Sequence, residues 1–251
     1  MKRLWNFVLR QVHGRVEGDP LVPTGDWTPV TGQELTPEEQ AVVDRFHSLY
    51  YEKWRQEGFA TVSVGWFGHH AFKCPMDLWI YQEILVETRP DVIIETGTRF
   101  GGSALFLASI CHLLGHGRVI TVDIDNETPR PEHELVTYIS GSSTEIATVE
   151  RVRAAIGEDQ RCMVILDSDH KADHVLRELE IYSDWVAEGC YLIVEDTNIG
   201  GNPVFSDYGD PGPAKAVDSF LATRSEFVID RSRERFLLTL HPGGFLRRIA
   251  S

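Results

Sequence analysis

Apolar and polar positions alternate regularly from about residue 75 to the end of the chain. Five short runs are almost continuously apolar and rich in β-branched residues, the pattern of strands buried on both faces; they lie at 91–95, 118–123, 135–140, 162–167 and 190–196. Between these runs, apolar residues recur every three or four positions, which is the spacing of amphipathic helices. The pattern predicts an α/β domain with a parallel sheet and helices on both faces.

The helices expected from this spacing lie at 75–88, 103–115, 144–157, 174–189 and 214–223. Two more strand-like runs, at 226–230 and 235–240, follow the last of these helices and predict a C-terminal antiparallel pair. Together with the five apolar runs, they give a mostly parallel sheet of seven strands. The sequence shows no internal repeat and no second domain.

The N-terminal part of the chain differs in character. Residues 1–33 are rich in Gly, Pro and Thr and predict an irregular arm, and Thr36 with Glu39 can form the capping box of a following helix. We therefore divide the chain into 1–74, an arm and helix that cover a ligand site or make oligomer contacts, and 75–251, the α/β domain. Core packing explains the apolar stripe of the N-terminal helix equally well.

Composition narrows the classes of partner. The formal net charge of −14, from 24 basic and 38 acidic residues, argues against nucleic acid, which requires clustered Lys and Arg. No stretch approaches the roughly 20 apolar residues of a membrane span, and the N-terminus lacks the apolar core of a signal peptide. The four cysteines form no CxxC pair, so we expect reduced thiols and a cytoplasmic protein.

Acidic residues stand where the predicted strands end: Glu95, Asp123, Asp167, Glu195 and Asp196. The carboxyl ends of parallel strands meet at one edge of the sheet, where ligands bind near the switch point. Carboxylates gathered there repel one another unless cations or hydrogen-bond donors compensate them. This edge is therefore the predicted functional site.

The segment from Glu95 to Ser103, ETGTRFGGS, resembles a nucleotide-binding turn. Gly97 permits a tight turn and a close approach to a ligand. The segment lacks the G-x-G-x-x-G fingerprint of dinucleotide-binding proteins, so a purely structural turn explains it as well. Asp123 favours a ligand, because an acid at the end of the next strand can accept hydrogen bonds from both ribose hydroxyls.

The acids of the later strands indicate a cation. Asp167 and the pair Glu195–Asp196 end neighbouring predicted strands and can converge on one point. Hard oxygen ligands suit Mg²⁺, Mn²⁺ or Ca²⁺. The alternative is that strand-end acids cap the helices that follow, and capping is the role that we expect for Asp169.

At these residues the sequence resembles the cephalosporin hydroxylase family, which includes rhamnosyl O-methyltransferases. The resemblance runs from about Trp66 to Leu246. The motifs that carry it are KCPMDLWIYQE, PDVIIETGTRFGGSALF, VDID, LDSDH, HVLRELEIY, YLIVEDTN, GPAKAV and PGGFL. It implies the Rossmann-like fold of methyltransferases that use S-adenosylmethionine (SAM), with 75–251 as the SAM-dependent domain, and it implies a homo-oligomer.

The strand-end pattern is also similar to that of catechol-type O-methyltransferases, and this similarity implies a role for each residue. The residues expected to bind SAM are Glu95, Gly97, Arg99, Ser103, Asp123, Ser143 and Thr144. Asp167, Glu195 and Asp196 take the positions of the metal ligands, which are Mg²⁺ ligands in the catechol enzymes. His170 falls where those enzymes have a general-base lysine, so it either takes the acceptor proton or only packs beside its helix.

The acceptor is implied to be a small hydroxylated molecule, a sugar or natural-product hydroxyl. Residues available to line its pocket are His69, His70, Trp66, Phe205 and Tyr208, although a histidine pair in a loop is often only surface. Two rival interpretations stay open at this point. One is a dinucleotide-linked or cephem-type oxidoreductase, and the other is a non-catalytic SAM-binding protein.

Overall fold

The computed structural model of the chain describes residues 35–56 and 64–250. The expected arm at 1–33 lies outside the described residues. In chain order the helices and strands are α2 (Pro37–Gln56), β1 (Gly65–Trp66), β2 (His69–His70), α3 (Pro75–Thr88), β3 (Val92–Thr96), α4 (Gly102–Leu114), β4 (Arg118–Asp123), β5 (Val136–Ser140), α5 (Ile146–Ala155), β6 (Cys162–Leu166), α6 (Ala172–Tyr182), η1 (Ser183–Trp185), β7 (Tyr191–Val194), α7 (Gly212–Leu221), β8 (Phe227–Ile229), η2 (Arg231–Glu234) and β9 (Phe245–Arg248).

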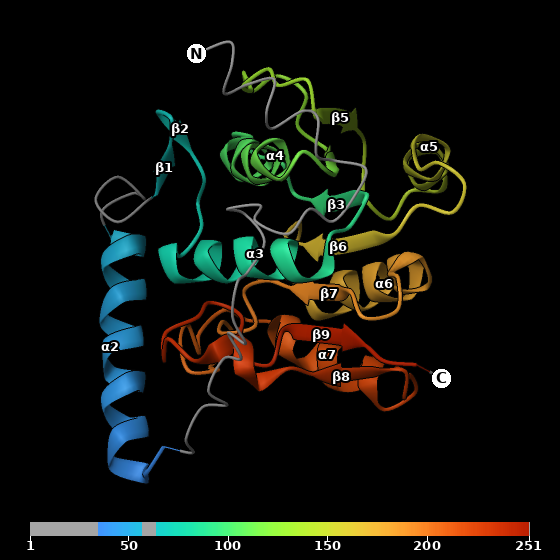
Figure 1. The fold of residues 1–251 in the computed structure, drawn as a ribbon. Helices are drawn as coiled ribbons and strands as arrows, with labels where there is room; N and C mark the ends of the chain where they lie inside the picture. Colours follow the sequence, from blue (N-terminus) through green and yellow to red (C-terminus); the bar gives the residue numbers. More distant parts are fainter. Residues whose placement is uncertain (1–34, 57–63, 251) are drawn as a thin grey trace, which may run out of the picture.

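The main sheet has seven strands in the order β5-β4-β3-β6-β7-β9-β8 (Figure 1). The first five strands of this order are parallel, whereas β9 runs antiparallel to both β7 and β8. The chain leaves β3 toward β4 on one side and returns to β6 on the other, so a switch point lies at the carboxyl end of β3. The predicted α/β class, the number of strands and the presence of a C-terminal antiparallel pair are confirmed, although one strand of that pair lies later in the chain than predicted.

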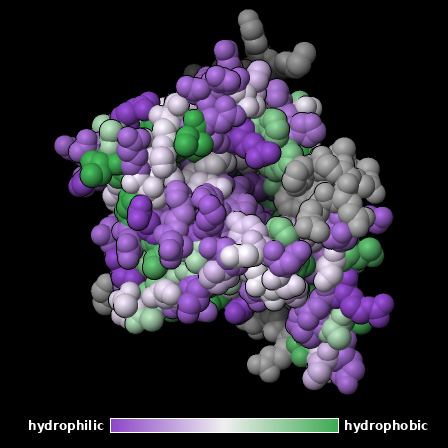
Figure 2. Space-filling view, turned by 180° about the vertical axis from the view of Figure 1, so that it is seen from behind, coloured by the Kyte–Doolittle hydropathy of each residue, from purple (hydrophilic) through white to green (hydrophobic). Residues whose placement is uncertain are grey.

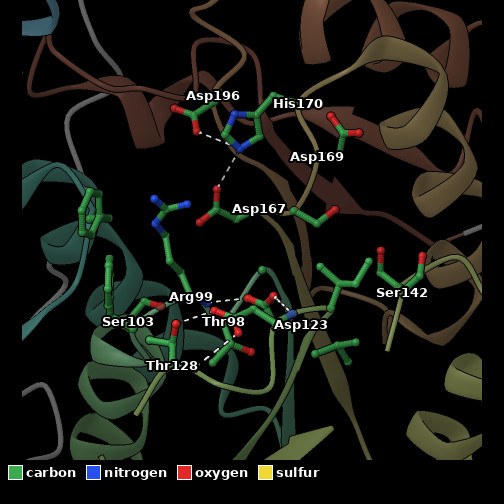
Figure 3. A pocket seen from close by; sticks show the side chains of 18 of the residues that line it. Thr98, Arg99, Ser103, Asp123, Thr128, Ser142, Asp167, Asp169, His170 and Asp196 are labelled. Atoms are coloured by element: carbon green, nitrogen blue, oxygen red, sulfur yellow. Dashed lines mark hydrogen bonds and ion pairs between the residues drawn. The ribbon is translucent and has the colours of Figure 1, made fainter. Parts of the chain in front are cut away.

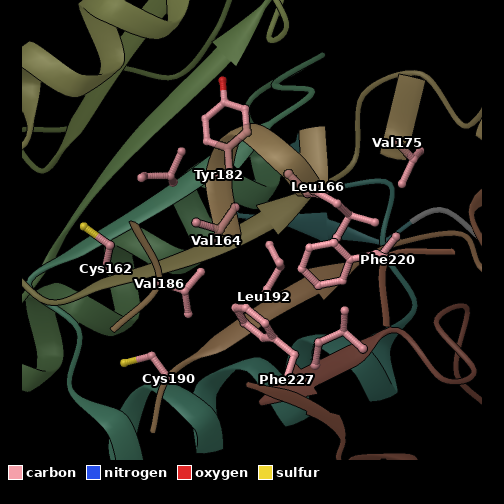
Figure 4. Close-up of a cluster of buried hydrophobic side chains, with 14 of the residues drawn as sticks. Cys162, Val164, Leu166, Val175, Tyr182, Val186, Cys190, Leu192, Phe220 and Phe227 are labelled. Carbon is pink, nitrogen blue, oxygen red and sulfur yellow. The ribbon is translucent and has the colours of Figure 1, made fainter. Parts of the chain in front are cut away.

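Two apolar cores hold the layers together, one on each face of the sheet. Along β3, Val92 and Ile94 face the core formed with α5, α6 and α7, whereas Ile93 between them faces the core formed with α3 and α4. Figure 4 shows the first core, where Tyr182 of α6 and Phe220 of α7 cover strand residues such as Val164. This burial on both faces is why the strand sequences are continuously apolar.

The N-terminal helix α2 begins as the capping box predicts. The Thr36 backbone N–H donates to Glu39 Oε2 at 2.8 Å, and the Glu39 N–H donates back to Thr36 Oγ1 at 3.3 Å. α2 stands along one side of the domain (Figure 1). Its buried contact is His47, whose Nε2 lies 2.9 Å from Asn198 Nδ2 in the loop after β7. α2 therefore braces that loop.

One predicted strand is wrong. Residues 235–240 form no strand, and β9 at Phe245–Arg248 pairs with β7 instead. Leu238 and Leu240 pack against Cys74 at the start of α3, and Leu237 has a left-handed backbone with a φ of 68° that a strand does not accommodate. The run is apolar because it packs against the start of α3. An apolar pattern alone cannot distinguish a segment that packs on a helix from a strand of the sheet.

The described surface is mostly polar. Viewed from behind, hydrophilic residues dominate, and hydrophobic residues on this face lie scattered rather than in one large patch (Figure 2). Among the described helices, none is long and apolar enough to cross a membrane. All four cysteines are buried and unpaired.

Candidate active site

A cavity of about 660 Å³ opens at the carboxyl ends of β3, β4 and β6. Its volume is typical of a small-molecule site. The wall consists mainly of the segments 70–72, 97–100, 122–125, 141–143 and 167–170, with Ser103, His174 and Asp196. Figure 3 shows Asp167, His170 and Asp196 at one side of this cavity, with Asp123 and Ser142 at the other. The cavity therefore joins the two groups of acids that the sequence analysis singled out.

The turn after β3 depends on glycine for contacts within the protein. Gly97 has a φ of 87°, and a Cβ there would lie 1.8 Å from the carbonyl oxygen of Asp167. A Cβ on Gly102 would lie 2.2 Å from the carbonyl oxygen of His70. These close approaches to neighbouring backbone set the positions of the β6 end and the 70–72 segment relative to the turn, and Gly97 also lines the cavity.

Replacing Gly97 by Ala should therefore destabilise the fold by about 3 kcal/mol or more, the sum of left-handed strain and a steric overlap with backbone. Gly189 is a matched control, since its φ is 78° and nothing lies within 4 Å of a Cβ built there. G189A should cost only about 1 kcal/mol. Thermal melts of the two variants measure the difference, and equal melting temperatures would show that the β6 end yields to the added methyl group.

Glu95 lies beneath the cavity floor. Its carboxylate accepts hydrogen bonds from Ser103 Oγ and, at 2.7 Å, from Thr121 Oγ1, and its side chain is fully buried. Burial raises the pKa of Glu95, although Lys73 opposes the shift. Of this group, Ser103 reaches the cavity wall. Glu95 therefore fixes the start of α4 to β4, and any influence on a ligand passes through Ser103.

Asp123 reaches the cavity with a carboxylate that is already oriented. Its Oδ2 accepts a hydrogen bond from the Arg99 backbone N–H at 2.6 Å, and its Oδ1 accepts one from the Asp125 N–H at 2.8 Å. The guanidinium of Arg130 lies 3.6 Å from Oδ2. A carboxylate has about four acceptor positions, so Asp123 keeps capacity for ligand hydroxyls.

The loop after β5 supplies the far wall of the cavity. Gly141, Ser142 and Ser143 line it. Thr144 lies outside the wall and contacts Ser142, with the two hydroxyl oxygens 3.3 Å apart. Of the two residues expected on the adenine side, the structure brings Ser143 to the cavity and leaves Thr144 behind it, with Ser142 in its place.

A buried lysine that the sequence analysis missed lies among the acids. The Lys73 ammonium contacts Asp167 Oδ2 and lies 2.6 Å from Glu195 Oε1, with its side chain 2% exposed. Burial works against its charge, but Asp167 and Glu195 outweigh burial and raise the pKa of Lys73. The argument that adjacent acids require a cation could have led to Lys73, since it stands just before a predicted buried helix. Lys73 therefore supplies part of the positive charge that compensates Asp167 and Glu195.

Glu195 and Asp196 point in different directions. Glu195 Oε1 accepts a hydrogen bond from Tyr81 Oη at 2.7 Å and contacts Lys73, behind the cavity. Asp196 faces the cavity, where Asp167, His170 and Asp196 each offer an atom within 4.8 Å of the others. The carboxylates of the predicted trio Asp167, Glu195 and Asp196 therefore do not meet at one point in this structure. His170, rather than Glu195, is the third residue beside Asp167 and Asp196.

The cluster of Asp167, His170 and Asp196 has the properties of a cation site. Asp196 Oδ1 is buried and has no hydrogen-bond partner. His170 Nε2 lies 3.3 Å from Asp167 Oδ1 and 3.2 Å from Asp196 Oδ2. Burial opposes protonation of His170, but the two carboxylates outweigh it and raise the pKa of the imidazole to about 9. The imidazolium thus bridges the two acids.

An aromatic group that the sequence analysis did not single out borders the cavity. The rings of Phe72 and Phe100 stack with their centroids 5.2 Å apart, and His70 lies about as close to Phe100, at 5.8 Å. The Arg99 guanidinium lies 5.4 Å from both phenyl rings. All four residues line the cavity, and together they give it an apolar and cationic stretch of wall.

Most residues expected to contact the acceptor are not among those that line this cavity. Trp66 donates a hydrogen bond from Nε1 to Ser109 Oγ at 3.0 Å and packs edge-on against Phe106, so it is a packing residue. Phe205 packs between Tyr51 of α2 and Tyr208 and does not line the cavity. His69 is exposed. Of the five, only His70 lines the cavity.

The expected helix cap is also only partly observed. Asp169 Oδ1 accepts a hydrogen bond from the Lys171 N–H at 3.3 Å, just before α6. The first N–H of the helix, that of Ala172, donates to Asp210 Oδ1 at 2.9 Å. Asp210 belongs to the loop before α7, so the cap comes from a segment that is distant in sequence.

The parallel sheet, the β3 turn and the acid at the end of β4 define the class of SAM-dependent methyltransferases with a Rossmann-like fold. Residues 59–249 match the family model described as "Rhamnosyl O-methyltransferase/CmcI". The chain is 37% identical over 205 residues to a rhamnosyl O-methyltransferase of Mycobacterium bovis, covering 79% of this chain and 83% of that protein. The rhamnosyl O-methyltransferase of Mycobacterium leprae is 36% identical over 204 residues, covering 79% and 89%.

The chain thus belongs to the rhamnosyl O-methyltransferase/CmcI family, and it is a SAM-dependent O-methyltransferase. Both rival interpretations are thereby set aside. Among solved structures, "cmcI-D160 Mg-SAM" superposes with a TM-score of 0.60 at 23% identity, covering 79% of this chain and 84% of that one. "CmcI-N160 apo-structure" also gives 0.60, covering 90% and 91%. These likenesses establish the fold.

Proposed function

We propose that this enzyme transfers the methyl group of SAM to a hydroxyl of a small glycosylated molecule, with a rhamnosyl group as the foremost acceptor. The single observation that carries this proposal is the shared cavity, in which the β3 turn and Asp123 face the same space as His170 and Asp196. The similarity to rhamnosyl O-methyltransferases supports the rhamnosyl acceptor. The stacked rings of Phe72 and Phe100 also support it, because aromatic faces pack well against the apolar face of a sugar ring.

For SAM, we assign the β3 turn to the methionine end and Asp123 to the ribose. Arg99 and Ser103 line the turn side of the cavity, and the Arg99 guanidinium can pair with a carboxylate. Ser142 and Ser143 line the opposite end, next to the apolar side chains of Val122 and Ile124, which suits a purine ring. Glu95 supports this site from below, and Thr144 supports Ser142.

We also propose that a divalent cation, Mg²⁺ with Mn²⁺ or Ca²⁺ as alternatives, binds at Asp167 and Asp196. The unpartnered Asp196 Oδ1 and the hard oxygen donors support it. Of the residues near it, Glu195 is the third ligand expected from sequence and His170 is the one that the geometry offers. A bound cation would lower the pKa of the acceptor hydroxyl and fix its orientation.

His170 is the proposed general base. The hydroxyl oxygen attacks the methyl carbon as its bond to sulfur breaks, S-adenosylhomocysteine leaves, and the hydroxyl proton passes to His170 Nε2. The basic form of His170 requires that the negative charge of Asp167 and Asp196 be neutralised, since these carboxylates raise the pKa of His170 to about 9. Lys73 holds the other oxygen of Asp167 and so keeps Oδ1 toward the cavity.

The proposal is tested by incubating the protein with SAM and a panel of glycosides, with MgCl₂ or with EDTA. We expect methylated rhamnosyl glycoside by mass spectrometry in the presence of Mg²⁺, and almost none in EDTA. Matched glycosides in which the rhamnose hydroxyls are already methylated are the control and should not react. Transfer that is unaffected by EDTA would contradict the role of the cation, and transfer only to non-glycosylated hydroxyls would contradict the acceptor.

We further infer a homo-oligomer that assembles through α2 and a cytoplasmic location. Val42, Phe46 and Leu49 of α2 lie on one helical face and are 67%, 50% and 57% exposed. An apolar helical face of this kind supports association with a second copy.

The four unpaired cysteines support a reducing compartment.

A further inference from the structure

We propose that His241 is a positioning residue that sets the direction of both acids of the Glu195–Asp196 pair. His241 lies in the loop between η2 and β9, and its side chain is 1% exposed. His241 does not itself line the cavity, so it would act only through its neighbours. This inference rests on the proposed cation at Asp196.

The first arm of His241 holds Asp196. The Asp196 backbone N–H donates to His241 Nδ1 at 3.2 Å. Asp196 has a φ of 51°, a left-handed conformation that costs a residue with a Cβ about 1 kcal/mol and therefore needs support. This backbone conformation turns the Asp196 carboxylate toward His170 and the cavity, whereas Glu195 turns toward Tyr81.

The second arm reaches Glu195 through Tyr81. Because Nδ1 accepts a hydrogen bond from a backbone N–H, the ring proton belongs on Nε2. Nε2 lies 3.0 Å from Tyr81 Oη and 3.4 Å from Asp77 Oδ2, and Tyr81 Oη donates to Glu195 Oε1 at 2.7 Å. The chain of donors therefore runs from His241 to Tyr81 to Glu195, and it keeps the Glu195 carboxylate behind the cavity.

The residues on either side of His241 form hydrogen bonds with the residues that follow β7. Thr197 Oγ1 donates to the Pro242 carbonyl at 2.9 Å, and the Asn198 N–H donates to the Leu240 carbonyl at 3.3 Å. These bonds hold the two segments together on either side of the His241 contact. They provide a control, because loosening them tests general stability without removing the imidazole.

The experiment compares His241→Asn with His241→Gln in the full-length protein. The Asn side-chain oxygen can take the place of Nδ1, whereas a Gln amide reaches the place of Nε2 and leaves the Asp196 N–H without its acceptor. Mn²⁺ affinity is measured by electron paramagnetic resonance, and SAM affinity by calorimetry. Loss of a partner outside the ligand sphere typically weakens metal binding about 10- to 100-fold. We expect that loss for H241Q, a smaller loss for H241N, and unchanged SAM affinity for both.

Two further variants separate positioning from stability. Thr197→Val removes the neighbouring bond to Pro242, so it should lower the melting temperature without weakening Mn²⁺ binding. Tyr81→Phe releases only Glu195, so it should weaken Mn²⁺ binding less than H241Q does. Equal Mn²⁺ affinities for H241N and H241Q, or a T197V variant that loses as much as H241Q, would overturn the role of His241. If the unaltered protein binds no Mn²⁺, the proposed cation site fails instead.

Discussion

Asp196→Asn is expected to weaken Mn²⁺ binding by more than the roughly 100-fold that removal of an outer partner costs. It should also lower kcat by about 10³-fold, equivalent to about 4 kcal/mol of transition-state stabilisation. The substitution keeps the shape of the side chain and removes one negative charge. Asp196 Oδ1 is buried without a partner, so the amide would present either a neutral oxygen or an N–H to the cation.

Asp169→Asn is the matched control for this loss. Asp169 lines the same cavity, but its side chain is 45% exposed and its carboxylate contacts Lys171. D169N removes the same charge from the same wall and should leave Mn²⁺ affinity nearly unchanged. If D169N and D196N weaken the metal equally, the effect is one of overall charge, and Asp196 is not a ligand.

The same titration with Glu195→Gln identifies the third ligand. A loss as large as that of D196N would support the trio predicted from sequence, with Glu195 leaving Lys73 to join the cation. A small loss would assign Glu195 to Lys73 and Tyr81, as the hydrogen bonds in the structure have it. Either result leaves Asp167 and Asp196 as the common pair.

His170→Ala is expected to lower kcat by about 10²- to 10⁴-fold, the usual contribution of a general base. Because the proposed role is proton transfer, Mn²⁺ affinity should fall by less than the roughly tenfold that a supporting partner contributes. SAM affinity should stay unchanged. Rates with SAM and a rhamnosyl glycoside, together with Mn²⁺ titrations of the same preparations, measure the three quantities.

Chemical rescue distinguishes a base from a ligand. Added imidazole should restore part of the H170A rate, and the restored rate should follow the fraction of imidazole in its neutral form. A large loss of Mn²⁺ affinity in H170A, without rescue, would instead place His170 in the metal site. That outcome agrees with its position 3.2 Å from Asp196 Oδ2 and would leave the proton acceptor to be sought elsewhere.

The strands were predictable because each is a local pattern. The run 118–123 is mostly apolar between its two ends since both of its faces are covered, and the structure makes it β4. The run 235–240 has a similar composition, yet it packs against the start of α3. An apolar pattern indicates that a segment is buried, but not which element covers it. That element is determined by contacts between residues that are distant in the sequence.

The sequence by itself determined that Asp123, Asp167 and the Glu195–Asp196 pair stand at one edge of the sheet. The physical reason is that parallel strands bring their carboxyl ends to the same side. Only the tertiary structure decided which acids face the cavity. Lys73 and Tyr81 draw Glu195 behind it, and His241 supports the turned backbone of Asp196. Those partners precede the pair by more than a hundred residues or follow it by 45, so no local pattern could show which of the two acids each partner holds.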